Sequence, residues 1–95
     1  MLLVKDTVVV TIRGARNYWR YTLRLWIEEI KDIIENECGV LIDVDTEESN
    51  DEVPRVLVDG IDVLEGIPGE EGYLIEVLKE SLKSLGMCRS SEFTY

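Results

Sequence analysis

The chain has no histidine, no glutamine and a single alanine among its 95 residues. Without histidine, a His-ligated metal site and every mechanism that uses an imidazole as acid or base are excluded. No apolar run approaches the roughly 18 residues that a membrane-spanning helix needs. The apolar residues 1–4 are followed at once by Lys5 and Asp6. We therefore expect no signal peptide, no membrane partner and a cytoplasmic protein.

Acidic residues are plentiful, with twenty Asp and Glu against ten Lys and Arg and a formal net charge of −10. This charge disfavours nucleic acid as a partner. Hydrophobic residues make up 45% and charged residues 32%, which predicts a folded chain. The abundance of charge and the absence of glutamine are typical of thermophile proteins. We expect one domain at residues 7–86, an N-terminal extension at 1–6 and a C-terminal tail at 87–95.

The bases are concentrated near the N-terminus. Residues 1–26 hold five bases against one acid, whereas residues 27–95 hold five bases against nineteen acids. The average charge therefore hides one basic patch.

The hydrophobic pattern predicts six elements in the order β-α-β-β-β-α. Strands are expected at residues 7–13, 40–45, 55–58 and 61–65, and helices between Asn17 and Gly39 and between residues 67–71 and Gly86. Asn17 is a favoured N-cap, and glycine is favoured just beyond the end of a helix. Asp59-Gly60 between two apolar runs is typical of a hairpin turn. The acidic residues 46–52 are expected to form a loop.

These elements predict an α/β fold with a four-stranded mixed sheet and two helices on one face. The first strand is nearly continuous in β-branched residues, which suits burial on both faces and a central place in the sheet. The expected strand order is second, first, third, fourth, with the first two parallel. Apolar side chains recur at helical spacing in both helices. The predicted core stripes are Trp19, Leu23, Trp26, Ile27, Ile30 and Ile34, and then Leu74, Ile75, Leu78, Leu82 and Leu85.

Three segments carry a family resemblance: Thr11–Gly14 before the long helix, Val53–Gly60 around Pro54, and Val63–Gly66 before the last helix. Over residues 7–86 the chain resembles the thioredoxin-like superfamily, nearest to small archaeal glutaredoxin-like redox-disulfide proteins. The resemblance implies a minimal thioredoxin-like fold and a cis peptide bond before Pro54. It also implies that Val53 presents its backbone groups to an extended partner segment.

The chain departs from this family at the redox centre. Where the family has a Cys-x-x-Cys pair at the start of the first helix, this chain has Asn17 and Arg20. Neither side chain supplies the thiolate that dithiol exchange requires. We therefore expect no catalytic residues and no cofactor.

Four arginines lie around these two positions: Arg13, Arg16, Arg20 and Arg24. The last three are four residues apart and share one helix face. The sequence leaves two readings open. Either the arginines pair with the chain's own acids, such as those at residues 47–52, or they bind a phosphate or carboxylate of a ligand or partner.

The aromatic residues nearby divide in the same way. Trp19 and Trp26 fall on the core stripe, whereas Tyr18 and Tyr21 fall off it. The two tyrosines are therefore either ordinary surface residues or the lining of a groove beside the arginines.

Two cysteines, Cys38 and Cys88, are each expected just beyond or at the end of a helix, at the same end of the molecule. The sequence leaves open whether they are free thiols or form a disulfide. The acidic run between Asp43 and Glu52 lacks the glycine and terminal glutamate of an EF-hand, so we expect no metal site.

The leading functional hypothesis is a non-catalytic interaction module that binds an anionic ligand or an acidic partner protein. Its candidate binding residues are Arg13, Arg16, Asn17, Arg20, Arg24, Val53 and Pro54. One alternative is a thiol-redox protein, or one that depends on a bound thiol cofactor. A second alternative is nucleic-acid binding through the arginines and tyrosines.

Overall fold

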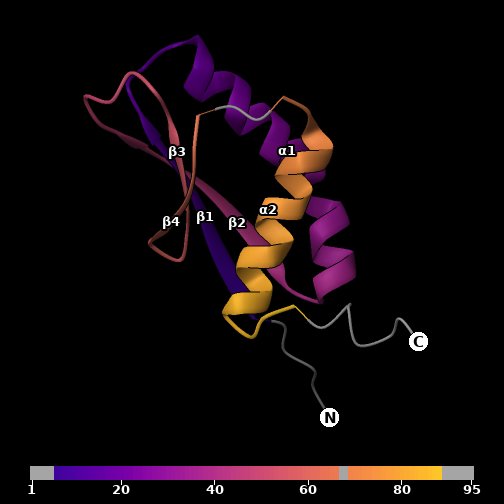
Figure 1. Ribbon diagram of the computed structural model, residues 1–95. Helices are drawn as coiled ribbons and strands as arrows, with labels where there is room; N and C mark the ends of the chain where they lie inside the picture. The colour runs from indigo at the N-terminus through magenta and orange to yellow at the C-terminus, as the bar shows by residue number, and fades with distance from the viewer. Residues whose placement is uncertain (1–5, 67–68, 89–95) are drawn as a thin grey trace.

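A computed structural model of the protein describes residues 6–66 and 69–88 (Figure 1). Its elements follow the expected order β-α-β-β-β-α. They are β1 (Thr7–Gly14), α1 (Tyr18–Cys38), β2 (Leu41–Glu48), β3 (Arg55–Val58), β4 (Ile61–Glu65) and α2 (Glu71–Ser84). The predicted extension and tail lie mostly outside the described residues.

The four strands form one mixed sheet in the order β2-β1-β3-β4. β1 pairs in parallel with β2 and antiparallel with β3, which in turn pairs antiparallel with β4. The first strand is central because the α1 crossover places β2 on one side of it and the chain returns with β3 on the other. The predicted α/β fold class and strand order are confirmed.

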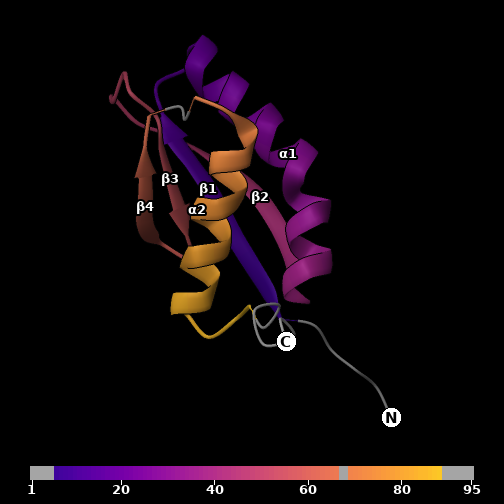
Figure 2. The same cartoon turned by 45° about the vertical axis from the view of Figure 1, so that its right-hand side comes forward.

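Both helices cover the same face of the sheet, as Figure 2 shows. Val8, Val10 and Ile12 of β1 point into the core beneath the helices and are buried. The alternate residues of β1 face the other side, where Val9 is exposed. The expectation that β1 is buried on both faces is therefore wrong. In the part of the chain that the structure describes, both helices lie on one side of the sheet and no element covers the other side.

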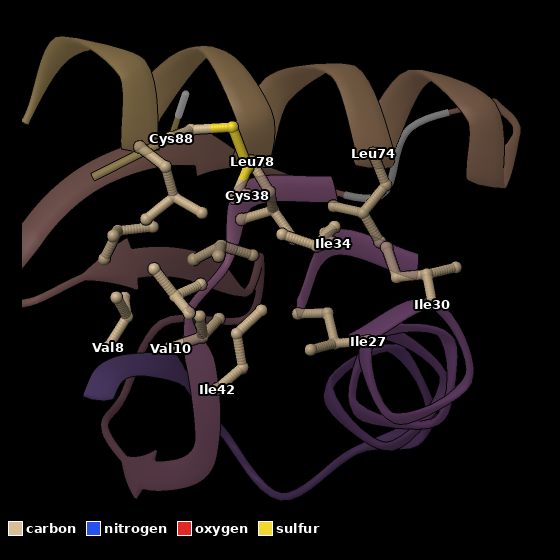
Figure 3. Close-up of a cluster of buried hydrophobic side chains, with 14 of the residues drawn as sticks. Val8, Val10, Ile27, Ile30, Ile34, Cys38, Ile42, Leu74, Leu78 and Cys88 are labelled. Atoms are coloured by element: carbon tan, nitrogen blue, oxygen red, sulfur yellow. A yellow bond between two sulfur atoms is a disulfide. The ribbon is translucent and has the colours of Figure 1, made fainter. Parts of the chain in front are cut away.

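The core lies between this sheet face and the two helices (Figure 3). Most of the predicted stripe residues are buried in it: Leu23, Ile27, Ile30 and Ile34 of α1, and Leu74, Leu78 and Leu82 of α2. Trp26 and Ile75 are partly buried against them. Leu85, by contrast, is 38% exposed because α2 ends before it. No helix in the described part of the chain is long and apolar enough to cross a membrane.

β2 is longer than its sequence pattern indicates. It continues through Thr46, Glu47 and Glu48, which were expected to form a loop. These residues pair with the last three residues of β1 in the parallel ladder. Backbone pairing with a buried neighbour strand thus outweighs the weak strand propensity of glutamate.

The helix ends match the predicted caps. The Asn17 side-chain oxygen accepts a hydrogen bond from the Arg20 amide at 3.0 Å. Gly39 ends α1 in the left-handed conformation. After α2, the Gly86 amide donates to Lys83 and the Met87 amide donates to Leu82. With Gly86 at positive φ, this pattern is a Schellman motif.

Cys38 and Cys88 form a disulfide, with their Cα atoms 4.2 Å apart (Figure 3). The question that the sequence left open is therefore decided in favour of the bridge. Both cysteines are buried in the core cluster, and Met87 packs against it. The bridge closes a loop of 50 residues between the end of α1 and the segment after α2.

Candidate functional site

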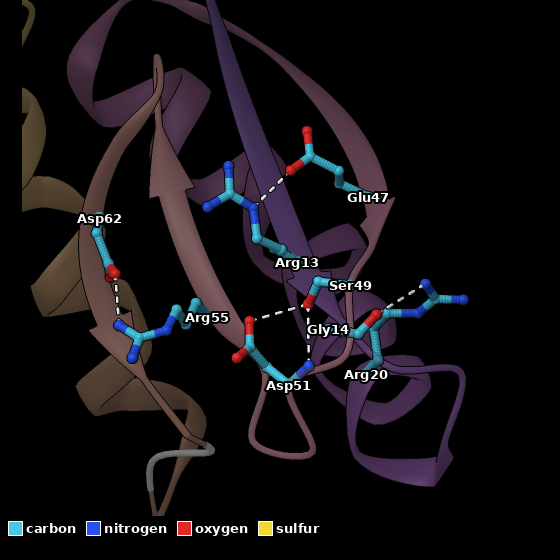
Figure 4. A network of polar contacts seen from close by, with 8 residues as sticks. All are labelled: Arg13, Gly14, Arg20, Glu47, Ser49, Asp51, Arg55 and Asp62. Carbon is cyan, nitrogen blue, oxygen red and sulfur yellow. Dashed lines mark hydrogen bonds and ion pairs between the residues drawn. The ribbon is translucent and has the colours of Figure 1, made fainter.

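The site lies where β1 ends and α1 begins, and two backbone segments meet there. The Ser49 amide donates to the Gly14 carbonyl at 3.1 Å, and the Ala15 amide donates to the Asp51 carbonyl at 2.8 Å. Within the loop, the Ser49 hydroxyl contacts the Asp51 carboxylate at 2.9 Å (Figure 4). These bonds hold the loop after β2 against the turn before α1.

Gly14 packs directly on Pro54. A Cβ atom at Gly14 would lie 3.2 Å from the Pro54 Cα, which is closer than nine in ten real Cβ contacts, so a larger residue here requires the Pro54 backbone to shift. On its other side, the Pro54 carbonyl accepts a hydrogen bond from the Gly66 amide at 2.8 Å. Pro54 is buried between these two glycines.

The Val53–Pro54 peptide bond is trans, since the described residues contain no cis peptide bond. The expectation of a cis-proline is therefore wrong. Trans is the lower-energy isomer of an X–Pro bond in the absence of constraints that select the other. The contacts of Pro54 with Gly14 and Gly66 are made with the trans isomer.

An open groove of about 690 Å³ lies beside Pro54. We call it the aromatic groove, and its lining residues are Asn17, Tyr18, Trp19, Glu52, Val53, Pro54 and Gly66. The Tyr18 and Trp19 rings form an edge-to-face pair with centroids 5.3 Å apart. Tyr18 is 68% exposed and Trp19 is 53% exposed. The prediction that Trp19 belongs to the core is wrong.

Trp19 is exposed because α1 is longer than the elements that cover it. α1 has 21 residues and α2 has 14, and the first turn of α1 projects beyond the start of α2 (Figure 1). Trp19 therefore occupies a core position of the helical stripe without a core opposite it. Trp26, two turns further on, does reach the core.

Asn17 serves mainly to build this corner. Its side-chain oxygen caps α1, and its side-chain nitrogen donates to the Glu52 carbonyl at 3.1 Å. Both polar atoms of the side chain are thus engaged within the chain. Asn17 positions the first turn of α1 against the segment that carries Val53 and Pro54.

A second hollow, of about 380 Å³, lies on the other side of Tyr18. We call it the arginine hollow, and its lining residues are Arg16, Asn17, Tyr18, Arg20, Tyr21, Arg24 and Thr46. The structure thus brings together three of the four predicted arginines. The arginine hollow shares Asn17 and Tyr18 with the aromatic groove.

The arginines of the hollow have long or neutral contacts. Arg16 lies 3.6 Å from a Glu48 carboxylate oxygen and Arg24 lies 3.9 Å from Glu28. Arg20 has no ion pair among the described residues. It donates instead to the Gly14 carbonyl at 3.2 Å. Exposed ion pairs of this length contribute little free energy, so the three guanidinium groups retain most of their capacity for an anion.

Arg13 lies apart from this hollow. It is in register with Glu47 across β1 and β2, on the face of the sheet that the helices leave open, and pairs with it there (Figure 4). Arg55 on the same face pairs with Asp62 at 2.7 Å and Glu65 at 3.2 Å. The hydrogen bond to Asp62 and the charge of Glu65 raise the pKa of Arg55 above its usual value. Of the two readings of the arginines, pairing with the chain's own acids thus describes Arg13 best.

No protein-family model matches the chain, and no curated protein matches it.

The sequence-predicted residues divide between the two cavities. Val53 and Pro54 line the aromatic groove, Arg16, Arg20 and Arg24 line the arginine hollow, and Asn17 lines both. Sequence reasoning missed Thr46 and Glu52 as lining residues, because both were assigned to a solvated acidic loop. Parallel pairing of Thr46 with Ile12 turns Thr46 toward the helix side, a signal that appears only once the strand register is known.

The lining residues of the two cavities are suited to binding, since they offer aromatic rings, a proline and guanidinium groups. Neither cavity contains a cysteine, serine or lysine among its lining residues. Within the described residues, no three Cys, Asp or Glu side chains are grouped to hold a metal ion. The disulfide lies at the far end of α1, about 30 Å away at 1.5 Å rise per residue.

Proposed function

We propose that this protein is a non-catalytic interaction module that binds an extended segment of an acidic partner protein. The observation that carries the proposal is that the two cavities adjoin each other. An apolar groove with exposed aromatic rings adjoins a hollow lined by three arginines, and both share Tyr18. A segment with an apolar side chain in the groove and an acidic one over the arginines would use both.

The backbone beside Pro54 supports an extended ligand. Val53 is 49% exposed, and neither its amide nor its carbonyl is hydrogen-bonded to a described residue. Unpaired backbone groups next to apolar pockets are what an extended peptide recognises by strand addition. Trp19 and Tyr18 would supply rigid apolar contact area, which often dominates the energy of such interfaces.

The resemblance to the thioredoxin-like superfamily supports the same proposal. The order β2-β1-β3-β4 with α1 and α2 on one face is the arrangement that the resemblance implies. The trans Val53–Pro54 bond is a departure from it. In this interpretation the groove is a ligand surface that has kept its place in the fold, with Asn17 and Arg20 where a dithiol would be.

The thiol-redox alternative has less support. A disulfide exchanges when a thiolate attacks one of its sulfurs, so it must be accessible. Cys38 and Cys88 are both buried and lie at the opposite end of α1 from the groove. We expect no insulin-reducing activity with dithiothreitol or glutathione as reductant.

The proposal is tested with two capped decapeptides, one of alternating valine and glutamate and one of alternating valine and lysine. We expect the glutamate peptide to bind and to shift the backbone amide resonances of residues 17–21 and 52–54 in a ¹H–¹⁵N titration. Trp19→Ala should weaken this binding about tenfold or more, the loss of a central aromatic contact. Tyr73→Ala removes an equally exposed aromatic ring on α2, outside both cavities, and is the matched control.

Equal binding of the two peptides would contradict an acidic partner. Binding that Trp19→Ala and Tyr73→Ala weaken equally would contradict the groove as the site. Salt-dependent binding of a short single-stranded oligothymidylate to the same residues, stronger than that of the glutamate peptide, would favour the nucleic-acid alternative.

A further inference from the structure

The arginine hollow indicates a more specific class of ligand, and this inference rests on the proposed function. We propose that the hollow recognises a phosphorylated side chain of the partner segment. The ligand class is a phosphomonoester carried next to apolar residues that occupy the aromatic groove.

The positive charge of the arginine hollow favours a ligand group with more negative charge than a carboxylate has. Two of its arginines already face carboxylates of the chain, Arg16 with Glu48 and Arg24 with Glu28, at 3.6 and 3.9 Å. A glutamate from a partner would bring only a single negative charge to a hollow that three arginines line. A phosphomonoester carries about −1.5 to −2 charge at neutral pH and three strong acceptor oxygens, so it can engage more than one guanidinium.

Arg20 is positioned to bind a phosphate group. Its Nη1 donates to the Gly14 carbonyl at 3.2 Å, which anchors the guanidinium beside the first turn of α1. A guanidinium has five donors, so Arg20 keeps most of its donors for a ligand. Its anchor is neutral, so its full positive charge faces the hollow. A planar guanidinium fork matches phosphate oxygens two at a time.

The surroundings also favour one localised phosphate over a polyanion. Carboxylates border both cavities: Glu48 beside Arg16, Glu28 beside Arg24, and Glu52 in the aromatic groove. A nucleic-acid strand that leaves the hollow in these directions would meet negative charge. A single phosphate on an otherwise uncharged peptide segment would not.

Tyr18 and Tyr21 add a second element of recognition. They are three residues apart on α1, and both are exposed and line the hollow. Rings at this spacing lie on neighbouring parts of one helix face. They offer an apolar flank to the body of a phosphorylated side chain, and an aromatic body such as that of phosphotyrosine gains most from them.

The experiment compares three capped hexapeptides of valine and leucine that differ only at one central residue, which is phosphotyrosine, tyrosine or glutamate. Dissociation constants are measured at matched ionic strength. We expect the phosphotyrosine peptide to bind about tenfold or more tightly than either of the others, as charge-assisted pairs to several arginines would give. Its affinity should rise between about pH 5 and pH 7, as the phosphate loses its second proton near pH 6. The affinity of the glutamate peptide should change little over this range.

Variants assign the effect to the hollow. Arg20→Ala should remove most of the preference for phosphotyrosine, and Arg20→Lys should restore only part of it, because lysine keeps the charge but not the fork. Arg13→Ala removes the same charge from the open face of the sheet and should leave the preference unchanged. A thermal unfolding curve of each variant reports whether it is folded.

Equal affinity for the phosphotyrosine and glutamate peptides would overturn this inference and leave the proposed function standing. Inorganic phosphate that binds as tightly as the phosphotyrosine peptide would overturn it in favour of a free-anion site. A preference lost equally in Arg13→Ala and Arg20→Ala would show a general charge effect and overturn it as well. Failure of all three peptides and of the valine–glutamate decapeptide would overturn the proposed function too.

Discussion

Where α1 and α2 end, Cys38 and Cys88 are buried and covalently joined, whereas where α1 begins, Tyr18 and Trp19 are exposed around two cavities. One helix thus connects a closed end and an open end, about 30 Å apart at 1.5 Å per residue. In a domain this small, few residues are available for a core. The Cys38–Cys88 disulfide lies at the opposite end of α1 from the arginine hollow. Because the disulfide stabilises one end, the other end can expose aromatic and basic side chains.

The largest expected effect on stability comes from removing the disulfide at the closed end. The double variant Cys38→Ala, Cys88→Ala should lose about 4 kcal/mol of the free energy of unfolding, the loop-entropy estimate for a closed loop of this size. Guanidinium denaturation of the variant measures this loss, and the wild-type protein with reductant should approach it. After denaturation without reductant, the wild-type protein should contain no reactive thiol. Two thiols per chain, or an unchanged stability, would contradict the closed end.

The next effect compares a core residue with a groove residue. Leu78→Ala should cost about 2–5 kcal/mol, the range for large truncations in a core, because Leu78 is fully enclosed. Trp19→Ala should cost no more than about 0.5 kcal/mol, as for an ordinary surface substitution, although it removes more atoms. Trp26→Ala, at a partly buried position, should lie between them. Chemical denaturation of the three variants tests the order. A cost for Trp19→Ala equal to that of Leu78→Ala would mean that the open end is structural.

A third prediction concerns the floor of the open end. Gly14→Ala places a methyl group 3.2 Å from the Pro54 Cα, so the segment that carries Val53 and Pro54 must move. We expect a loss of about 1–3 kcal/mol, typical of overpacking. The backbone resonances of residues 52–54 should shift with it. Gly69→Ala is the matched control, because no described residue beyond its chain neighbours has an atom within 4 Å of the added methyl group. Equal behaviour of the two variants would show that the contact with Pro54 yields easily.

The smallest effect concerns an ion pair near the closed end. Lys79 of α2 donates to Glu37 of α1, and this hydrogen bond raises the pKa of Lys79 above its usual 10.5. A raised folded-state pKa gives stability that is complete below 10.5 and is lost as the pH rises through the folded-state value. Lys79→Gln should therefore be less stable than wild type by about 0.2–1 kcal/mol, and the difference should shrink in strong alkali.

The control for this pair is Lys83→Gln. Lys83 pairs with Glu80 within α2, so its loss breaks no link between the helices. Unfolding curves at neutral and alkaline pH measure both variants. A difference between Lys79→Gln and wild type that grows with pH would reverse the sign of the argument.

The fold could be predicted from the sequence because its signals are local. β-branched runs separated by Gly14, Asp59-Gly60 and two amphipathic stripes define the elements, and a parallel crossover followed by a hairpin leaves few topologies. The caps at Asn17 and Gly86 were equally readable. The end of β2 was not, because Glu47 and Glu48 join the sheet through their partners in β1 and not through their own propensity.

The candidate site could be predicted only in part. The arginines are visible as a charge asymmetry. Nearness in the sequence grouped Arg13 with the others, but the alternation of β1 places Arg13 on the opposite face of the sheet. The helical periodicity predicted a core position for Trp19, because periodicity does not show that α1 extends beyond the start of α2. The expectation of a cis Val53–Pro54 bond came from the family resemblance, whereas the structure has the trans isomer that X–Pro bonds favour by default.

The edge strand β2 has a consequence for how the molecule behaves among copies of itself. An edge strand presents unpaired backbone groups that would template another strand and lead to aggregation. On β2, exposed carboxylates recur at every second residue, at Asp43, Asp45 and Glu47. Two such edges brought together would oppose like charges along their whole length. The acidity of β2 therefore favours solubility, because it opposes edge-to-edge pairing between copies of the chain.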